Sequence, residues 1–168
     1  REEPILWGPE PEPIDEVLNS APAKEDKLEK PVGDVIDQLL SSAKEGDTEA
    51  MVNLGLAYAS SEGGAQNFTA AYGWFARAAA LQNPRGMFEL AQCHLRGEGA
   101  PYDPATSFKL FKEAHELDYA PGTDGLATCY AEGLGTRADK KKAEDLFRKA
   151  SSQGYRVSEI KLETLQSR

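Results

Sequence analysis

The residues that could support nucleophilic chemistry are Cys93 and His94, which are adjacent in the sequence. A cysteine nucleophile needs a base within hydrogen-bonding distance of its sulfur. Adjacent side chains on a helix point in different directions, so these two cannot form that pair by themselves. Cys129 and His115 create no Cys-x-x-Cys or His-x-x-x-His spacing of the kind that binds zinc. We therefore expect no enzyme activity, no catalytic residue, no cofactor and no metal site.

Two Gly-x-Gly sequences, at residues 97–99 and 133–135, could suggest a phosphate-binding loop. Such a loop follows a strand and needs a third glycine or a Gly-Lys-Ser/Thr ending. Both sequences here follow a helical pattern and lack these additions. They are therefore interpreted as turns that end helices.

The glycines belong to a pattern that is written three times with a period of 36 residues. The equivalent positions are Leu54, Leu90 and Leu126; Gly63, Gly99 and Gly135; Phe75, Phe111 and Phe147; Ala78, Ala114 and Ala150; and Asn67, Asp103 and Asp139. A period of this length is typical of stacked units that bury their apolar faces against their neighbours.

Each copy is expected to contain two helices, because apolar and small residues recur at helical spacing before and after the glycines. Gly97 and Gly99 supply the left-handed backbone that ends the first helix of copy two. Asp103 is placed to cap the second helix, and Pro104 stands at its first position, where a missing N–H costs nothing.

These motifs resemble the Sel-one-like repeats, which are related to tetratricopeptide repeats. The residues that carry the resemblance are Leu54-Gly55-Leu56-Ala57-Tyr58, Trp74-Phe75-Ala76-Arg77-Ala78-Ala79 and Gly133-Leu134-Gly135-Thr136-Arg137-Ala138-Asp139. The resemblance implies an all-α fold, a right-handed α/α solenoid of three 36-residue helix-turn-helix repeats over residues 46–156. It also implies that the solenoid holds peptides or helices of other proteins.

Three departures from the repeat pattern are visible. Ser61 replaces the first turn glycine of copy one. His94 occupies the tyrosine position of copy two, where we expect a packed side chain. Gly122 and Gly125 lie inside the first helix of copy three and are expected to soften it, since glycine is a poor helix former.

Terminal segments flank the repeats. Residues 31–45 predict an N-terminal capping helix, and residues 157–168 predict a C-terminal capping helix on which Val157, Ile160, Leu162 and Leu165 recur. Residues 1–30 form an acidic, proline-rich arm whose composition cannot build a core alone. Within this arm Ile5-Leu6-Trp7 is the expected anchor, either on a partner or on the chain's own solenoid.

Charge and composition limit the classes of partner. The formal net charge is −9, and residues 1–45 hold twelve acids against five bases. This balance disfavours nucleic acid, so an RNA-binding helical-repeat protein is the weaker alternative. No apolar run approaches the about 18 residues of a membrane span, so direct membrane insertion is not expected.

The cysteines bear on the compartment. Equivalent helices in a stack lie about 8–10 Å apart, which is too far for the Cα separation of a disulfide. Cys93 and Cys129 are therefore expected to be free thiols, and a soluble protein of a reducing compartment is favoured. The start at Arg1 leaves open a targeting segment before it.

The expected binding surface is the inner, concave face formed by the first helix of each repeat. Its candidate residues are Val52, Leu56, Phe88, Gln92, Arg96, Asp124 and Thr128. The alternative is that the arm or packing between repeats covers Val52 or Phe88. A basic cluster at Arg137, Lys140, Lys141 and Lys142 is either a solvated face or a contact for an acidic protein.

The sequence therefore predicts a protein-binding module, an adaptor or accessory subunit of a larger assembly. A regulatory or assembly factor that captures a peptide transiently is the alternative.

Overall fold

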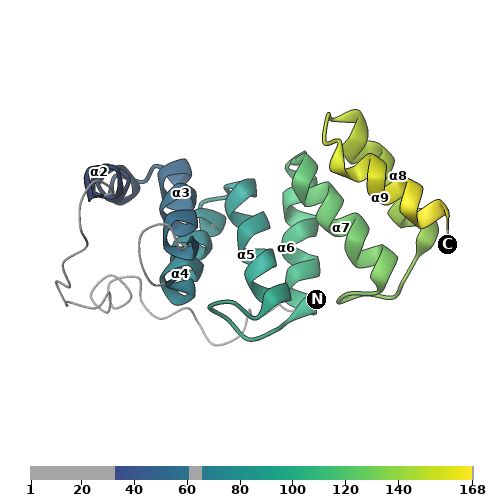
Figure 1. The fold of residues 1–168 in the computed structure, drawn as a ribbon, viewed down its shortest axis with the longest axis horizontal. Coiled ribbons are helices and arrows are strands. Elements are labelled where there is room, and N and C mark those ends of the chain that lie inside the picture. The colour runs from purple at the N-terminus through teal and green to yellow at the C-terminus, as the bar shows by residue number, and fades with distance from the viewer. Residues whose placement is uncertain (1–32, 61–65, 168) are drawn as a thin grey trace, which may run out of the picture.

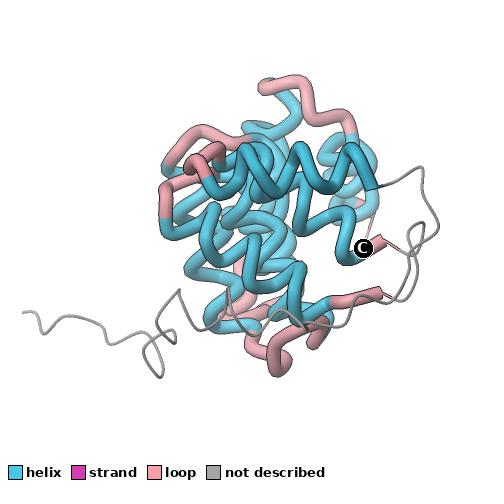
Figure 2. Tube along the Cα trace, turned by 90° about the vertical axis from the view of Figure 1, so that its left-hand side faces the viewer, coloured by secondary structure: helices cyan, strands magenta, loops and turns pink. Residues whose placement is uncertain are grey.

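The computed structural model describes residues 33–60 and 66–167, and this part of the chain folds into eight helices without a strand. The helices are α2 (Gly33–Lys44), α3 (Thr48–Ala59), α4 (Phe68–Ala80), α5 (Pro84–Arg96), α6 (Pro104–Glu116), α7 (Ala120–Glu132), α8 (Lys140–Ser152) and α9 (Val157–Gln166). Each helix packs on the next, and Figure 1 shows them arranged in one row from α2 to α9. In Figure 2 the described chain is drawn only in the helix and loop colours. The fold is an all-α solenoid.

The predicted arm, residues 1–30 with Ile5-Leu6-Trp7, lies outside the described residues. So does Ser61. None of the described helices has the length and apolar character to cross a membrane.

The second helix of each repeat begins at the predicted capping residue. The Asn67 side chain accepts a hydrogen bond from the Ala70 amide at 2.9 Å, and Asp139 accepts one from the Lys142 amide at 3.1 Å. Asp103 caps α6 in the same way, with Pro104 at the first helical positions. These oxygens satisfy amides that the helix itself leaves without partners. The predicted caps are confirmed.

The turn glycines have two separate functions. Gly97 and Gly133 end α5 and α7 with φ of 69° and 74°, in the left-handed region that glycine adopts without strain. At Gly99 and Gly135 the backbone of the preceding repeat is also very close. A Cβ at Gly135 would lie 2.1 Å from the carbonyl oxygen of Pro104. The second glycine thus allows one repeat to contact the next.

Gly122 and Gly125 do not interrupt α7, which runs as one helix of 13 residues. A Cβ on Gly122 would lie 2.5 Å from the Cβ of Ala114, and one on Gly125 would lie 2.5 Å from the ring of Phe111. Both glycines therefore allow α6 and α7 to approach closely. Packing between the two helices offsets the low helix propensity of these residues.

Equivalent positions of the three repeats form the core. The leucines, phenylalanines and alanines of the 36-residue pattern are all buried. Cys93 and Cys129 are buried free thiols, as predicted. His94 packs edge-on against Tyr72, with ring centroids 5.6 Å apart, which confirms the expected packed side chain.

The terminal helices differ in how they meet the stack. Leu39, Leu40 and Ala43 of α2 pack towards α3. Leu162 and Leu165 of α9 pack on the small cluster around Phe147. The other apolar residues of α9 face away from the core, since Val157 is 47% exposed and Ile160 is 68% exposed.

Candidate protein-binding surface

The first helices of successive repeats, α3, α5 and α7, and then α9, are neighbours in the stack. Contacts join α3 to α5 and α5 to α7, and hydrogen bonds join α7 to α9. We call the solvent-accessible side of these four helices the A-helix surface. All seven predicted concave-face residues lie on α3, α5 or α7.

A polar network joins α3 to α5. Glu49 accepts a hydrogen bond from the Asn83 side chain at 2.7 Å and one from Arg85 at 3.0 Å. Arg85 also donates to the Asn53 side chain at 3.1 Å. The hydrogen bond from Asn83 is the main cause that lowers the pKa of the Glu49 carboxyl. This network fixes the two helices side by side in the first half of the surface.

Aromatic rings join α5 to α6 and to Tyr119 at the start of α7. The Phe88 ring lies 5.8 Å from that of Phe111 and 6.1 Å from that of Tyr119, the latter in an edge-to-face arrangement. Phe88 is half-buried by these contacts. Packing on α6 and on the residue before α7 therefore covers part of the side chain that the sequence offers as an apolar contact.

A buried carboxylate joins α7 to α9. Asp124 is 4% exposed and accepts a hydrogen bond from Ser158 at 2.7 Å. Lys161 forms an ion pair with the same carboxylate and donates to the Thr128 hydroxyl at 3.3 Å. Asp124 was expected to select a partner. It is instead a structural residue, because its oxygens are occupied and its side chain is buried.

Val52 requires the same correction. Its exposed fraction is 0%, so it belongs to the core and offers no surface to a partner. Leu56, Phe88, Gln92 and Thr128 are partly exposed, and Arg96 is exposed with Glu98 at 3.7 Å. These five of the seven predicted residues remain on the A-helix surface.

The sequence did not indicate three further residues of this surface: Glu89, Tyr119 and Tyr155. All are half-buried. Tyr119 and Tyr155 are 36 residues apart and continue the series that begins with the capping residues Asp47 and Asn83. The period could have identified them, because two tyrosines stand where the earlier copies have helix caps.

The two thiols are poor nucleophiles at neutral pH. Burial raises the pKa of Cys93 to about 11 and that of Cys129 to about 12, so both thiols stay protonated. Burial also lowers the pKa of His115, whose Nδ1 lies 2.9 Å from the Thr123 hydroxyl. Among the described residues no group of three or more His, Cys, Asp or Glu side chains could hold a metal.

The basic cluster is dispersed around the start of α8. Lys142 lies 3.7 Å from the capping Asp139, and its ammonium is 5.2 Å from the centre of the Tyr130 ring. Arg137, Lys140 and Lys141 are exposed to solvent. These three cations remain accessible to an acidic partner.

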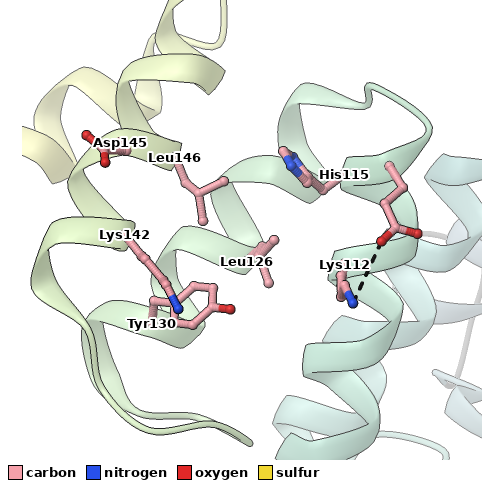
Figure 3. Close-up of a pocket in the computed structure, with 8 residues that line it drawn as sticks. Lys112, His115, Leu126, Tyr130, Lys142, Asp145 and Leu146 are labelled. Atoms are coloured by element: carbon pink, nitrogen blue, oxygen red, sulfur yellow. Dashed lines mark ion pairs between the residues drawn. The ribbon is translucent and has the colours of Figure 1, made fainter.

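A hollow of about 410 Å³ opens between α6, α7 and α8, away from the A-helix surface (Figure 3). Leu126, Tyr130 and Leu146 supply its apolar lining, and Lys112 and Lys142 reach it from opposite helices. One acidic side chain from each of the same two helices balances the lysines. The hollow therefore has no net preference for an anion or a cation.

Known solved structures share this architecture. One is c5321, a protective antigen of uropathogenic Escherichia coli displaying an SLR fold, with 30% identity, a TM-score of 0.67, and coverage of 71% of this chain and 26% of that one. A Sel1 repeat protein from Oxalobacter formigenes has 20% identity and a TM-score of 0.71, and the match covers 76% of this chain and 51% of that one. Cysteine rich protein B of Helicobacter pylori has 20% identity, a TM-score of 0.59, and coverage of 76% and 97%. The chain thus spans about a quarter of the length of c5321 and about half of the length of the Oxalobacter formigenes protein.

Sequence comparison gives the family. No curated protein is similar enough to this chain to count as a relative. The sequence pattern of the Sel1 repeat, however, matches residues 48–83, 84–119 and 124–155, which correspond to the helix pairs α3–α4, α5–α6 and α7–α8. Because these matches cover more than half of the sequence and agree with the helix pairs, the chain belongs to the Sel1 repeat family.

Proposed function

We propose that this chain is a non-enzymatic protein-binding module that acts as an adaptor or accessory subunit of a larger assembly. Proteins with Sel1 repeats are generally protein-interaction modules. The observation that carries the proposal is the A-helix surface, where partly exposed apolar, aromatic and polar side chains from successive repeats form one continuous face.

The surface is suited to binding because it is organised before a partner arrives. Hydrogen bonds hold α3 to α5, an aromatic contact holds α5 to Tyr119 at the start of α7, and a buried carboxylate holds α7 to α9. A partner therefore need not order these helices on binding, which lowers the entropic cost of association. Leu56 and Phe88 supply apolar contact, and Gln92, Arg96 and Thr128 supply polar selection.

Affinity capture from the source cells tests the proposal. The double variant Gln92→Arg/Arg96→Glu changes the chemistry of α5 at partly or fully exposed positions, so the fold should be unaffected. We expect it to lose the proteins that the original chain captures. The matched control, Lys112→Glu/Glu116→Lys on α6, reverses an exposed ion pair of 3.8 Å and should retain them. Equal capture by both variants would contradict binding at the A-helix surface.

The arm and the basic cluster are proposed as secondary contacts. Removal of residues 1–30 should weaken capture if Ile5-Leu6-Trp7 is an anchor for the partner. Full capture without the arm would exclude that function. If the exposed cations Arg137, Lys140 and Lys141 meet an acidic partner, the variant Lys140→Glu/Lys141→Glu should show a smaller loss of capture that high salt reproduces.

A further inference from the structure

The repeats can be compared position by position where successive A-helices meet. Between α3 and α5, Arg85 donates to Glu49 and to Asn53. One repeat later, 36 residues on, the equivalent of Arg85 is Pro121 and the equivalent of Asn53 is Glu89. At the contact between α5 and α7, a proline without a donor therefore stands in place of the guanidinium, and a carboxylate stands in place of the amide.

Glu89 is consequently left without a cation in direct contact, although the charges of Arg85 and Arg96 act on it without an ion pair. In residues 33–60 and 66–167 it makes no hydrogen bond or ion pair, although it is half-buried. The two arginines on the same helix are committed elsewhere, since Arg85 pairs with Glu49 at 3.0 Å and Arg96 pairs with Glu98 at 3.7 Å. A partly desolvated carboxylate without a partner reduces stability, because burial disfavours its charge.

Three aromatic residues interact with one another or with the charge of Glu89. Phe88 precedes it on α5 and packs edge-on against Tyr119. Tyr119 stands at the start of α7 without capping that helix through its side chain. Burial is the main cause that raises the pKa of Tyr119 and Tyr155, and the charge of Glu89 acts on both in the same direction. The charge of Glu89 therefore acts on Tyr119 and Tyr155, and Phe88 packs on Tyr119.

We propose that Glu89, together with Phe88, Tyr119 and Tyr155, receives an arginine or lysine side chain of the bound polypeptide. A carboxylate gives a cation a charge-assisted hydrogen bond, and ring faces attract it through their quadrupole. The cation of the partner would also take the place that Arg85 fills in the contact one repeat earlier. This inference rests on the proposed function and names the chemistry of the partner, a segment with a basic residue.

A random dodecapeptide library displayed on phage, selected against the full chain, tests the inference. We expect the selected peptides to share an arginine or lysine at one aligned position. The synthetic form of the strongest peptide should bind the Glu89→Gln variant about tenfold more weakly. A peptide whose basic residue is replaced by neutral citrulline or norleucine should bind the original chain about as weakly as the unchanged peptide binds Glu89→Gln. The same replacement should cause no further loss of binding to Glu89→Gln.

Two controls separate folding from recognition. Glu132→Gln removes an exposed acid from the end of α7 and should leave peptide affinity unchanged. Tyr155→Leu should weaken binding of the basic peptide more than binding of its neutral form. Thermal melting checks that every variant is folded. Peptides that bind the A-helix surface without a basic position, or lose nothing with Glu89→Gln, would overturn this inference but leave the proposed function standing. If no peptide is selected and capture does not depend on Gln92 and Arg96, both fail.

Discussion

The Ser158 hydroxyl donates a hydrogen bond to the Asp124 carboxylate at 2.7 Å, across 34 residues of sequence. Ser158 is fully buried, and Lys161 pairs with the other carboxylate oxygen. This contact is a buried polar link between the last repeat and α9. It explains why an acidic residue occupies a position that is apolar in the two earlier repeats, Val52 and Phe88.

Asp124→Ala should therefore lower the free energy of unfolding by about 2–3 kcal/mol, because it leaves the Ser158 hydroxyl buried without an acceptor. Urea denaturation measures the change. The matched control is Asp145→Ala, which removes an exposed carboxylate 3.1 Å from Arg148 and should cost about 0.5 kcal/mol or less. Equal effects of the two variants would contradict a structural function for Asp124.

Gly125→Ala should destabilise the chain by about 1–3 kcal/mol, because the new methyl group would overlap the Phe111 ring. Helix propensity predicts the opposite sign, a gain of about 1 kcal/mol. The sign of the change in urea denaturation therefore decides between packing and propensity. An increase in stability would mean that the glycine is not needed for the contact of α6 with α7.

Gln82→Gly should raise the free energy of unfolding by about 0.5–1 kcal/mol. Gln82 has a φ of 62°, a left-handed conformation that strains residues with a Cβ. Gly46 and Gly154 hold the equivalent turn in other copies, with φ of 97° and 89°. The reciprocal change, Gly154→Ala, should reduce stability. If both variants were less stable, relief of backbone strain would not explain this turn.

Phe88→Ala should cost about 2–3 kcal/mol of stability, since the ring packs on Phe111 of α6 and on Tyr119 at the start of α7. Gln92→Ala, one turn further on the same helix, should change stability by less than about 0.5 kcal/mol. Thermal melting distinguishes them. An unchanged melting temperature for Phe88→Ala would show that the ring serves binding alone.

Glu89 should make stability depend on pH in a defined direction. Burial raises the pKa of the Glu89 carboxyl above its ordinary value, so the folded state binds this proton more tightly than the unfolded state. The ionised carboxylate lowers the free energy of unfolding by its full amount when the pH is above the pKa of the folded state. This loss of stability disappears as the pH falls below the pKa of the unfolded state. Glu89→Gln should therefore be more stable than the original chain at pH 7, with a difference that shrinks towards pH 4. A difference that grows on acidification would contradict this sign.

The parts of the fold that the sequence predicts well are those that local chemistry decides. Asn67, Asp103 and Asp139 cap helices because a side-chain oxygen satisfies nearby amides, and glycines end helices because only they adopt the required φ without strain. The period of 36 residues then repeats each local solution. Helix pairs, turns and the repeated leucine, phenylalanine and alanine positions of the core could be predicted in this way.

The chemistry of the A-helix surface could not be predicted in the same way. Val52, Phe88 and Asp124 occupy one position of the repeat, yet Val52 is in the core, Phe88 is half-buried and Asp124 is an internal ion-pair partner. What covers each side chain depends on the residues that the next repeat supplies. The period identifies equivalent positions, whereas burial depends on contacts between copies that differ in sequence.

The most direct measurement is site-specific photo-crosslinking from the A-helix surface in source cells. A benzophenone amino acid is placed at Gln92 on α5 and, for comparison, at the exposed residue Ala105 at the start of α6. The account predicts a discrete crosslinked partner from position 92, and none from position 105. A partner that crosslinks only from position 105, or equally from both, would contradict the claim that successive A-helices form the surface that holds another polypeptide.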